Sequence, residues 1–174
     1  MRLALAIGDA GGVGPELAAK LLTHQDMRDR DVIVLGDARL LGLGARHGGL
    51  DLDLPTVAAA DLPDRLPAGK VMVDLGNCPP GDLTLGRSSQ GAGAASLQNF
   101  AAALRLAQAG VADAAMFTPF NKHSMRLARP AYVDEIGFID ATLGADRSGR
   151  EFNVLEEVWN ARVTSHIPLR EVAA

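Results

Sequence analysis

The sequence is poor in the residues on which several classes of protein depend. It has one cysteine, Cys78, which excludes an internal disulfide and a cysteine-rich zinc site. Aromatic residues make up only 4% of the chain, too few to suggest a surface that stacks bases. The net charge is −4 and no cluster of lysines and arginines is present, so we expect no nucleic-acid partner.

Long apolar runs are also missing. The apolar residues 1–7 are too few for the core of a signal peptide, and no run reaches the roughly 18 residues of a membrane-spanning helix. We therefore expect no membrane partner and a cytoplasmic location. An apolar content of 48% over 174 residues is typical of a folded domain with a core of its own.

Short apolar runs alternate with helical patterns along most of the chain. The patterns predict strands over residues 3–7, 31–37, 56–59, 70–76 and 112–120, and helices over 15–22, 38–49, 91–110, 121–128 and 133–144. Two further strands, joined by a tight turn, are predicted over 151–157 and 160–169. Strands that alternate with helices indicate an α/β fold, with helices on both faces of a mostly parallel sheet.

The segment between the first strand and the first helix, GDAGGVGPE, has four glycines in its first seven residues. Gly12 and Gly14 match two glycines of the dinucleotide fingerprint, but Leu17 stands at the third position. The chain also has no Gly-Lys-Ser/Thr triplet, so the loop is not a P-loop. The loop belongs to neither standard nucleotide-binding class.

Two interpretations of this loop remain open. Its glycines allow backbone N–H groups to converge on a ligand, and the helix that starts near Pro15 presents its positive end to an anion. Asp9 and Glu16 would repel an anion unless they are paired or bridged by a cation. The other interpretation is a tight turn between strand and helix that binds nothing.

Four segments together resemble the 4-hydroxythreonine-4-phosphate dehydrogenase family, in the order and spacing of that family. They are GDAGGVGPE (8–16), GRSSQGAGAASLQNFAAALRLAQAG (86–110), FTPFNKHSM (117–125) and ARVTSHIPLREV (161–172). The resemblance implies a three-layer fold like that of isocitrate and isopropylmalate dehydrogenases, truncated here. Residues 1–174 would form a single α/β unit that corresponds to about the N-terminal half of a two-domain enzyme.

The resemblance also implies an activity. Enzymes of this family use NAD or NADP and a divalent metal to oxidise a secondary hydroxyl of a small hydroxy acid, phosphorylated in the best-known case, and decarboxylation can follow. The expected partners are this substrate and a second copy of the chain in a homodimer, and the expected pathway is pyridoxal phosphate biosynthesis. The alternative is a non-catalytic domain that binds an anion or a metal, or that dimerises, derived from half of the same fold.

The resemblance further implies the site residues. The residues expected to bind substrate are Asn121, Lys122, Thr118 and His166, and those expected to line the cleft near substrate and cofactor are Asp9, Gly12, Gly14 and Glu16. Asn121 is also suited to cap the helix that follows it. Phe117 and Thr118 replace the Thr-Ala/Gly pair of the family, which leaves the identity of the substrate open. No catalytic residue is assigned.

One position departs from the family in a way that affects the metal. Glu135, thirteen residues after Lys122, stands where the family has the histidine of a Gly-His-Thr-Glu motif. We predict Glu135 as a ligand of a divalent metal, Mg²⁺, Mn²⁺ or Zn²⁺, with Asp134 as a substitute. A carboxylate in place of the histidine shifts the preference of the site from zinc toward the harder Mg²⁺ and Mn²⁺. The alternative is that these two acids open a helix, where negative charge is favourable.

Overall fold

The computed structural model describes residues 1–61, 66–147, 149–162, 164 and 168–172. The chain divides into two compact units, Met1–Val133 and Asp134–Ala174, and each is described by itself. The expectation that residues 1–174 form a single unit within a two-domain enzyme stays a prediction.

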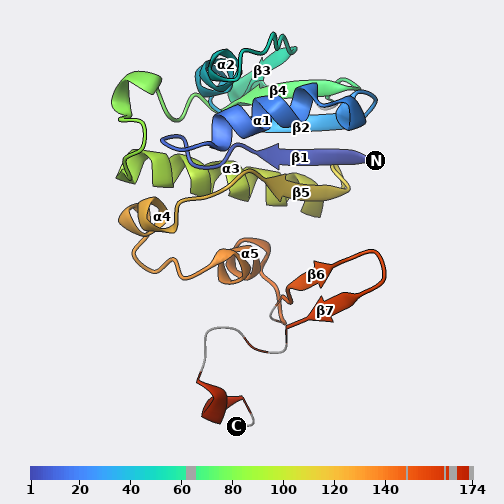
Figure 1. Ribbon diagram of the computed structural model, residues 1–174, viewed down its shortest axis with the longest axis vertical. Helices are drawn as coiled ribbons and strands as arrows, with labels where there is room; N and C mark the ends of the chain where they lie inside the picture. The colour runs from blue at the N-terminus through green and yellow to red at the C-terminus, as the bar shows by residue number, and fades with distance from the viewer. Residues whose placement is uncertain (62–65, 148, 163, 165–167, 173–174) are drawn as a thin grey trace. The chain divides into compact units, whose positions relative to one another are not determined.

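The first unit is built on a five-stranded sheet in which all neighbouring strands are parallel (Figure 1). In spatial order the strands are β3 (Thr56–Ala58), β4 (Lys70–Asp74), β2 (Asp31–Gly36), β1 (Arg2–Ala6) and β5 (Ala114–Phe117). The inner strands are almost continuously apolar because helices cover both of their faces. The predicted α/β class and parallel sheet are confirmed.

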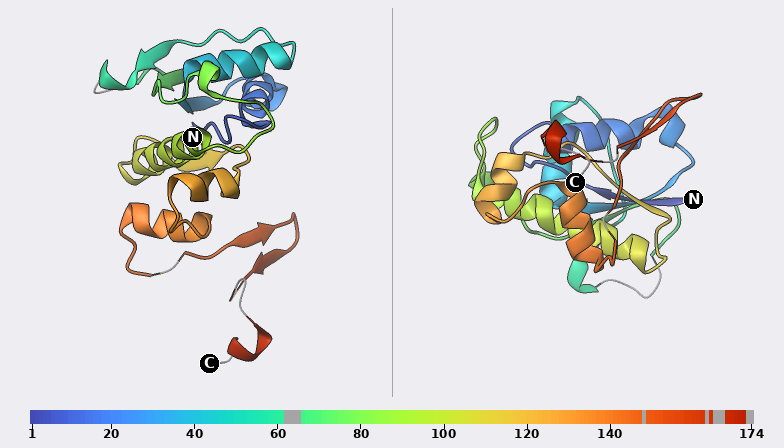
Figure 2. Two further views of the ribbon diagram at one scale, coloured as in Figure 1. Left: turned by 90° about the vertical axis from the view of Figure 1, so that its left-hand side faces the viewer. Right: turned by 90° about the horizontal axis from the view of Figure 1, so that it is seen from below.

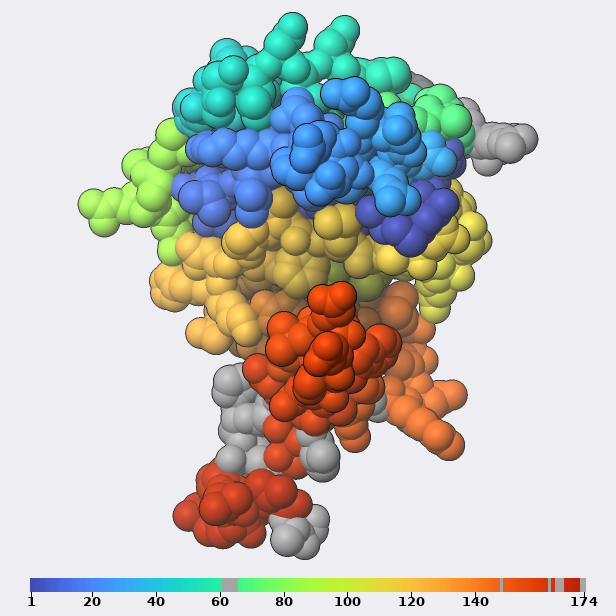
Figure 3. Space-filling model, turned by 45° about the vertical axis from the view of Figure 1, so that its right-hand side comes forward, coloured from blue at the N-terminus to red at the C-terminus, as the bar shows by residue number. Residues whose placement is uncertain are grey.

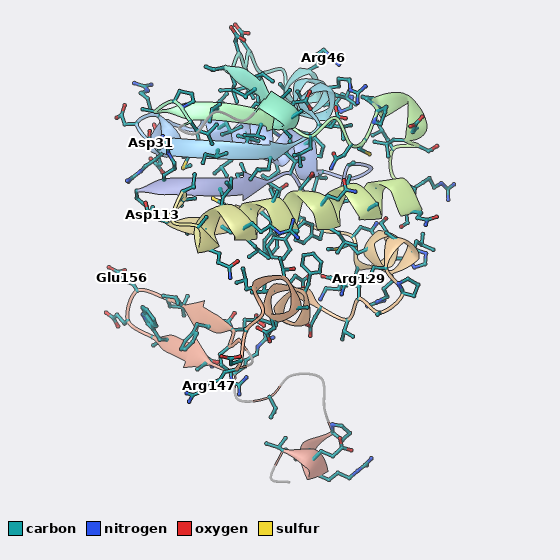
Figure 4. All side chains as sticks on the ribbon, turned by 180° about the vertical axis from the view of Figure 1, so that it is seen from behind. Asp31, Arg46, Asp113, Arg129, Arg147 and Glu156 are labelled. Carbon is teal, nitrogen blue, oxygen red and sulfur yellow. The ribbon has the colours of Figure 1, made fainter. Side chains whose placement is uncertain are left out.

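The helices of this unit form the two outer layers. They are α1 (Gly14–Thr23), α2 (Ala38–His47), α3 (Gln90–Gln108) and α4 (Lys122–Ala128). Helices α1 and α2 pack side by side on one face of the sheet (Figure 1), whereas α3 crosses the opposite face and packs against α4 (Figure 4). Figure 2 shows the same layers from two further directions. The three-layer prediction is therefore also confirmed.

Two glycines set the distance between packed helices. A Cβ atom on Gly44 of α2 would lie 2.3 Å from the carbonyl carbon of Pro15 in α1. A Cβ atom on Gly93 of α3 would lie 1.8 Å from the carbonyl oxygen of Ser124 in α4. Real Cβ atoms do not approach backbone so closely, and each helix pair therefore depends on its glycine.

The second unit contains α5 (Glu135–Leu143) and a separate antiparallel hairpin of β6 (Phe152–Val154) and β7 (Trp159–Ala161). The predicted hairpin is present with shorter strands, and part of its predicted second strand, residues 163 and 165–167, lies outside the described residues. Short 3₁₀ helices cover Gln25–Met27, Ala59–Asp61, Pro80–Asp82 and Leu169–Glu171. Among the residues that the structure describes, no helix has the length and apolarity to cross a bilayer.

The packing of α3 on α4 gives a first testable prediction. Gly93→Ala should lower the free energy of unfolding by about 1–3 kcal/mol, because the added methyl group meets backbone and pushes the two helices apart. Gly91→Ala in the same helix is the matched control, since nothing lies within 4 Å of its Cβ position and alanine favours a helix. Urea denaturation measures both variants. Equal stability of the two would contradict this account of the packing.

Candidate functional site

The order of the strands places a topological switch point between β1 and β5. From β1 the chain passes through α1 to β2 on one side, whereas β5 pairs with the other side of β1 and is reached through α3 on the opposite face. In open α/β sheets, ligands bind at such a point, beyond the carboxyl ends of the strands. The glycine loop after β1 and the segment after β5 both lie there.

These two segments are joined by hydrogen bonds between buried groups. The N–H of Gly8 donates to Oγ1 of Thr118 at 2.8 Å, and the N–H of Asp9 donates to the carbonyl oxygen of Pro119 at 2.9 Å. Gly8 has to be a glycine, because a Cβ atom there would lie 2.2 Å from the carbonyl oxygen of Thr118. Thr118 is therefore a buried residue that joins the two segments through its hydroxyl. Its contact with substrate stays a prediction.

Helix α3, which lies on the face of the sheet opposite α1, makes a hydrogen bond to the start of the glycine loop. The amide of Asn99, which is buried in the middle of this helix, donates to the carbonyl oxygen of Ile7 at 2.9 Å. The oxygen of the same amide accepts a hydrogen bond from Nδ2 of Asn77 at 3.0 Å. The backbone that leads into Asp9 is thus fixed by both neighbours, α3 and the segment after β5.

Asp9 is the central side chain of the site. It is only 8% exposed, and Nδ2 of Asn121 reaches its Oδ2 at 3.5 Å. The same Nδ2 donates to Oγ of Ser88 at 3.1 Å, so that three loops converge on one amide. The other oxygen of Asp9, Oδ1, is buried and has no hydrogen-bond partner among the described residues. Burial raises the pKa of Asp9, against the lowering effect of the Asn121 amide and the Gly11 N–H.

Two of the predicted loop glycines lie against Asp9, Gly12 at its carboxylate and Gly14 at its backbone. A Cβ atom on Gly12 would lie 2.9 Å from Oδ2 of Asp9, and one on Gly14 would lie 3.0 Å from the backbone N and O of Asp9. The close fit around Asp9 therefore favours glycine at both positions, a reason that comparison with the nucleotide-binding fingerprints does not reveal. The loop thus packs closely on Asp9, at its carboxylate through Gly12 and at its backbone through Gly14.

Asn121 is an N-cap as well as a partner of Asp9. Its Oδ1 accepts hydrogen bonds from the N–H groups of His123 and Ser124, both at 3.1 Å. This arrangement fixes the amide, so that its Nδ2 is directed at Asp9 and Ser88. Lys122 is the first residue of α4 and is exposed, directly beside this cluster in sequence. The capping interpretation of Asn121 is confirmed, and its contact with substrate stays a prediction.

Glu16 is engaged elsewhere. Its carboxylate pairs with Nζ of Lys20 one helical turn further along α1, at 2.5 Å. This hydrogen bond lowers the pKa of Glu16. The partner of Glu16 therefore lies within its own helix, and not in the cluster formed by Asp9, Ser88 and Asn121 (the Asp9 cluster).

The predicted metal ligands belong to the second unit. Asp134 is the N-cap of α5, where its Oδ1 accepts from the N–H of Gly137 at 2.8 Å, and Glu135 is the first residue of the helix. The two acids do open a helix, and their role as ligands stays a prediction. Within the described residues no three His, Cys, Asp or Glu side chains group as a metal site, and His166 lies outside that range.

Cys78 is buried, and its N–H donates to Oδ2 of Asp37 at 3.0 Å. Burial is the largest effect that raises the pKa of its thiol, and the negative charge of Asp37 adds to it. A thiol that resists deprotonation is a poor nucleophile, which agrees with a purely structural cysteine.

A separate hollow of about 130 Å³ lies away from the switch point. It is lined by Ala38, Leu41, Gly42, Leu52, Asp53, Leu54, Thr56 and Met72. None of the predicted site residues is among them.

Comparison of the sequence with models of known protein families identifies the family of this chain. A family model described as pyridoxal phosphate biosynthetic protein PdxA matches residues 28–174. The chain belongs to this family. The resemblance carried by the four segments is thereby confirmed.

Individual PdxA relatives agree over almost the whole chain. A protein of Rhizobium meliloti (strain 1021), provisionally named 4-hydroxythreonine-4-phosphate dehydrogenase 2, is 49% identical over 173 residues, which are 99% of this chain and 50% of the relative. The crystal structure of a 4-hydroxythreonine-4-phosphate dehydrogenase from Burkholderia phymatum matches 96% of this chain and 50% of its own, with a TM-score of 0.80 and 28% identity. The chain thus spans about half the length of these proteins.

A more distant structure shows that the fold occurs with another substrate. The crystal structure of a terephthalate 1,2-cis-dihydrodiol dehydrogenase from Burkholderia xenovorans LB400 matches 83% of this chain and 41% of its own, with a TM-score of 0.59 and 28% identity. The relatives are named as dehydrogenases, and their names differ in the substrate.

The burial of Asp9 predicts a characteristic dependence of stability on pH. Because the pKa of Asp9 is raised above its usual 3.8 in the folded state, the folded protein loses stability as pH rises from 3.8 through the raised value. Asp9→Asn removes this cost and keeps an oxygen for the Asn121 amide. The variant should therefore be more stable than the wild type at pH 7, and its advantage should vanish near pH 3.

Urea denaturation at a series of pH values measures this difference. Asp51→Asn, an exchange at an exposed loop residue, is the control and should change stability little at any pH. A loss of stability in Asp9→Asn that grows toward neutral pH would show that the charged carboxylate stabilises the fold.

Proposed function

We propose that this chain forms the substrate-side part of an NAD- or NADP-dependent dehydrogenase that oxidises a secondary hydroxyl of a small phosphorylated hydroxy acid. Membership of the PdxA family supports the reaction class. The observation that carries the proposal is the convergence of Asp9, Asn121 and Ser88 at the switch point, next to Lys122. The protein would act as a cytoplasmic homodimer.

The residues of the cluster are suited to different tasks. Lys122 carries a compact positive charge on a flexible stem at the start of α4, which suits a phosphate or carboxylate group of the substrate. Asn121 is held by its own capping bonds and by Asp9, so it presents an oriented amide. Thr118, His166 and the wall formed by Gly12 and Gly14 complete the proposed contacts.

The buried carboxylate of Asp9 supports a functional role because burial without full hydrogen bonding costs stability. An apolar residue at position 9, such as leucine or alanine, would bury no polar group and would therefore not lower the stability in this way. Asp9 acts in this proposal as a positioning residue, which fixes the amide of Asn121 and holds the loops after β1 and β5 together.

The proposed metal is Mg²⁺, Mn²⁺ or Zn²⁺, with Glu135 or Asp134 as one ligand. The described residues do not form a complete donor set by themselves, and Asp134 already uses one oxygen as a cap. No step of the reaction is therefore assigned to the metal here. The nicotinamide cofactor supplies the hydride chemistry, and the residues described above bind and orient the substrate.

The rings of Phe117 and Phe120 favour a second class of substrate. They stack with centroids 4.4 Å apart and an angle of 14°, immediately before Asn121, and Phe117 is 42% exposed. An aromatic hydroxy acid would find an apolar surface there. The terephthalate dihydrodiol enzyme with a similar fold makes this class worth testing beside the phosphorylated one.

Binding to the 174-residue chain tests the proposed role of Lys122. Lys122→Gln should weaken the binding of 4-hydroxythreonine 4-phosphate by about 10-fold or more, because a hydrogen bond to a charged group contributes about 1.5–3 kcal/mol. Arg126→Gln, which removes the same charge one turn further along α4, is the control and should leave affinity within a factor of two or so. Calorimetric titration measures both.

Unchanged affinity in Lys122→Gln would contradict the role of this lysine. Formation of NADH on addition of NAD, Mg²⁺ and substrate then separates the two functions expected from the sequence. Turnover supports a dehydrogenase, whereas binding without turnover supports the non-catalytic binding domain. Tighter binding of the terephthalate dihydrodiol than of the phosphorylated acid would favour the aromatic class.

A further inference from the structure

The hollow beside α2 has two walls that come from different segments of the first unit. One wall is the face of α2 on which Ala38 lies one helical turn from Leu41 and Gly42. The other wall is formed by residues of the segment 52–56, which leads into β3. In the space-filling view both segments, drawn in cyan to teal, lie together at one end of the first unit (Figure 3). We call this cavity the α2 hollow.

The floor of the α2 hollow is apolar and belongs to the core. Leu41 and Met72 are buried, and Leu52 and Leu54 pack on the same core cluster. The volume of about 130 Å³ is close to that of an engineered apolar cavity, about 150 Å³, that accepts benzene. A branched aliphatic side chain therefore fits on this floor.

Gly42 keeps the hollow open, although α2 itself has no need of a glycine there. Its backbone is helical, without the positive φ that favours glycine. A Cβ atom on Gly42 would meet only Nη1 of Arg46, at 3.6 Å, whereas one on Gly44 would collide with Pro15. Glycine within a helix is less favourable than alanine. The methyl group that would stabilise α2 at position 42 would fill part of the hollow.

Charges of opposite sign stand on the two walls. Asp53 is exposed at the rim, between Leu52 and Leu54, which turn inward. Arg46, labelled in Figure 4, lies one turn after Gly42 on the same face of α2. Neither charged side chain forms an ion pair with another residue that the structure describes. The hollow thus offers an apolar floor between a carboxylate and a guanidinium.

We propose that the α2 hollow binds a free amino acid that has an apolar side chain. The side chain packs on the leucine floor, the ammonium group lies at Asp53 and the carboxylate lies at Arg46. A simple amine or a simple carboxylic acid would match only one of the two walls. Since the α2 hollow shares no residue with the Asp9 cluster, this proposal does not rest on the proposed function.

Titration of the 174-residue chain with leucine, followed by two-dimensional NMR, tests the site. Leucine should shift the backbone amides of residues 38–46 and 52–56, with a dissociation constant in the millimolar range. Gly42→Ala should weaken this binding about 10-fold or more, because the added methyl group fills part of the hollow. The same variant should unfold at a temperature about 2–4 °C higher than the wild type, so that the loss of binding does not come from loss of the fold.

Gly91→Ala in α3 is the matched control for the glycine exchange. Nothing lies within 4 Å of its Cβ position, and it is far in sequence from the residues that line the hollow. This variant should be stabilised in the same way and should bind leucine as the wild type does.

Two analogues of leucine separate the roles of the charged groups. Isopentylamine lacks the carboxylate and 4-methylpentanoate lacks the ammonium group, and each should bind about 5-fold or more weakly than leucine. Asp53→Asn should weaken the binding of leucine and isopentylamine but not of 4-methylpentanoate. Arg46→Gln should weaken the binding of leucine and 4-methylpentanoate but not of isopentylamine. Asp51→Asn, which removes an exposed carboxylate outside the lining, is the control and should change none of these affinities.

Shifts that do not saturate, or that are equal in Gly42→Ala and the wild type, would overturn the proposal. So would unchanged affinity for leucine in both charge variants, or leucine-induced shifts confined to residues 8–14 and 118–124. Failure of 4-hydroxythreonine 4-phosphate to bind would instead contradict the proposed function and leave the α2 hollow unaffected.

Discussion

The first unit depends on the close approach of two loops, the one after β1 and the one after β5. Gly8 lies so near the backbone of Thr118 that no side chain fits between them, and the hydroxyl of that threonine accepts the hydrogen bond that the backbone needs. The loop then continues through Asp9, whose carboxylate lies against Gly12 and is reached by Nδ2 of Asn121. The candidate site exists because this contact brings residues more than one hundred positions apart to the same edge of the sheet.

The contact also explains why the loop contains so many glycines. A glycine loop that cradles phosphate has its N–H groups directed at a ligand. Here Gly12 instead leaves space for the carboxylate of Asp9, and Gly14 leaves space for the backbone of the same residue. Burial of that side chain works against stability, whereas the hydrogen bonds around it hold three loops in fixed positions. The buried carboxylate of Asp9 thus lowers the stability of the fold, and the hydrogen bonds around it fix the arrangement of the neighbouring polar side chains.

Much of the fold follows from local patterns. The strand of residues 31–37 and the helix of residues 91–110 were predictable because continuous apolar runs and helical periodicity are properties of nearby residues. The order of the strands is not local, so the pairing of β1 with β5, and with it the meeting of Asp9 and Asn121, was beyond prediction from pattern alone. Ser88 was missed for the same reason, since nothing in its neighbourhood distinguishes it from other loop serines. The strand predicted over 112–120 ends at Phe117 for a reason that is not local either, because the hydroxyl of Thr118 and the carbonyl oxygen of Pro119 accept hydrogen bonds from the distant glycine loop.

The central claim is that ligand binds where the loops after β1 and β5 meet. Two-dimensional NMR of the 174-residue chain, titrated with 4-hydroxythreonine 4-phosphate, tests it most directly. Binding at this place should shift the NMR signals of the backbone amides of residues 8–14 and 118–124 and of the side-chain amide of Asn121. Shifts confined to the hollow between α2 and the β3–β4 edge, with the signals of Asp9 and Asn121 unmoved, would contradict it.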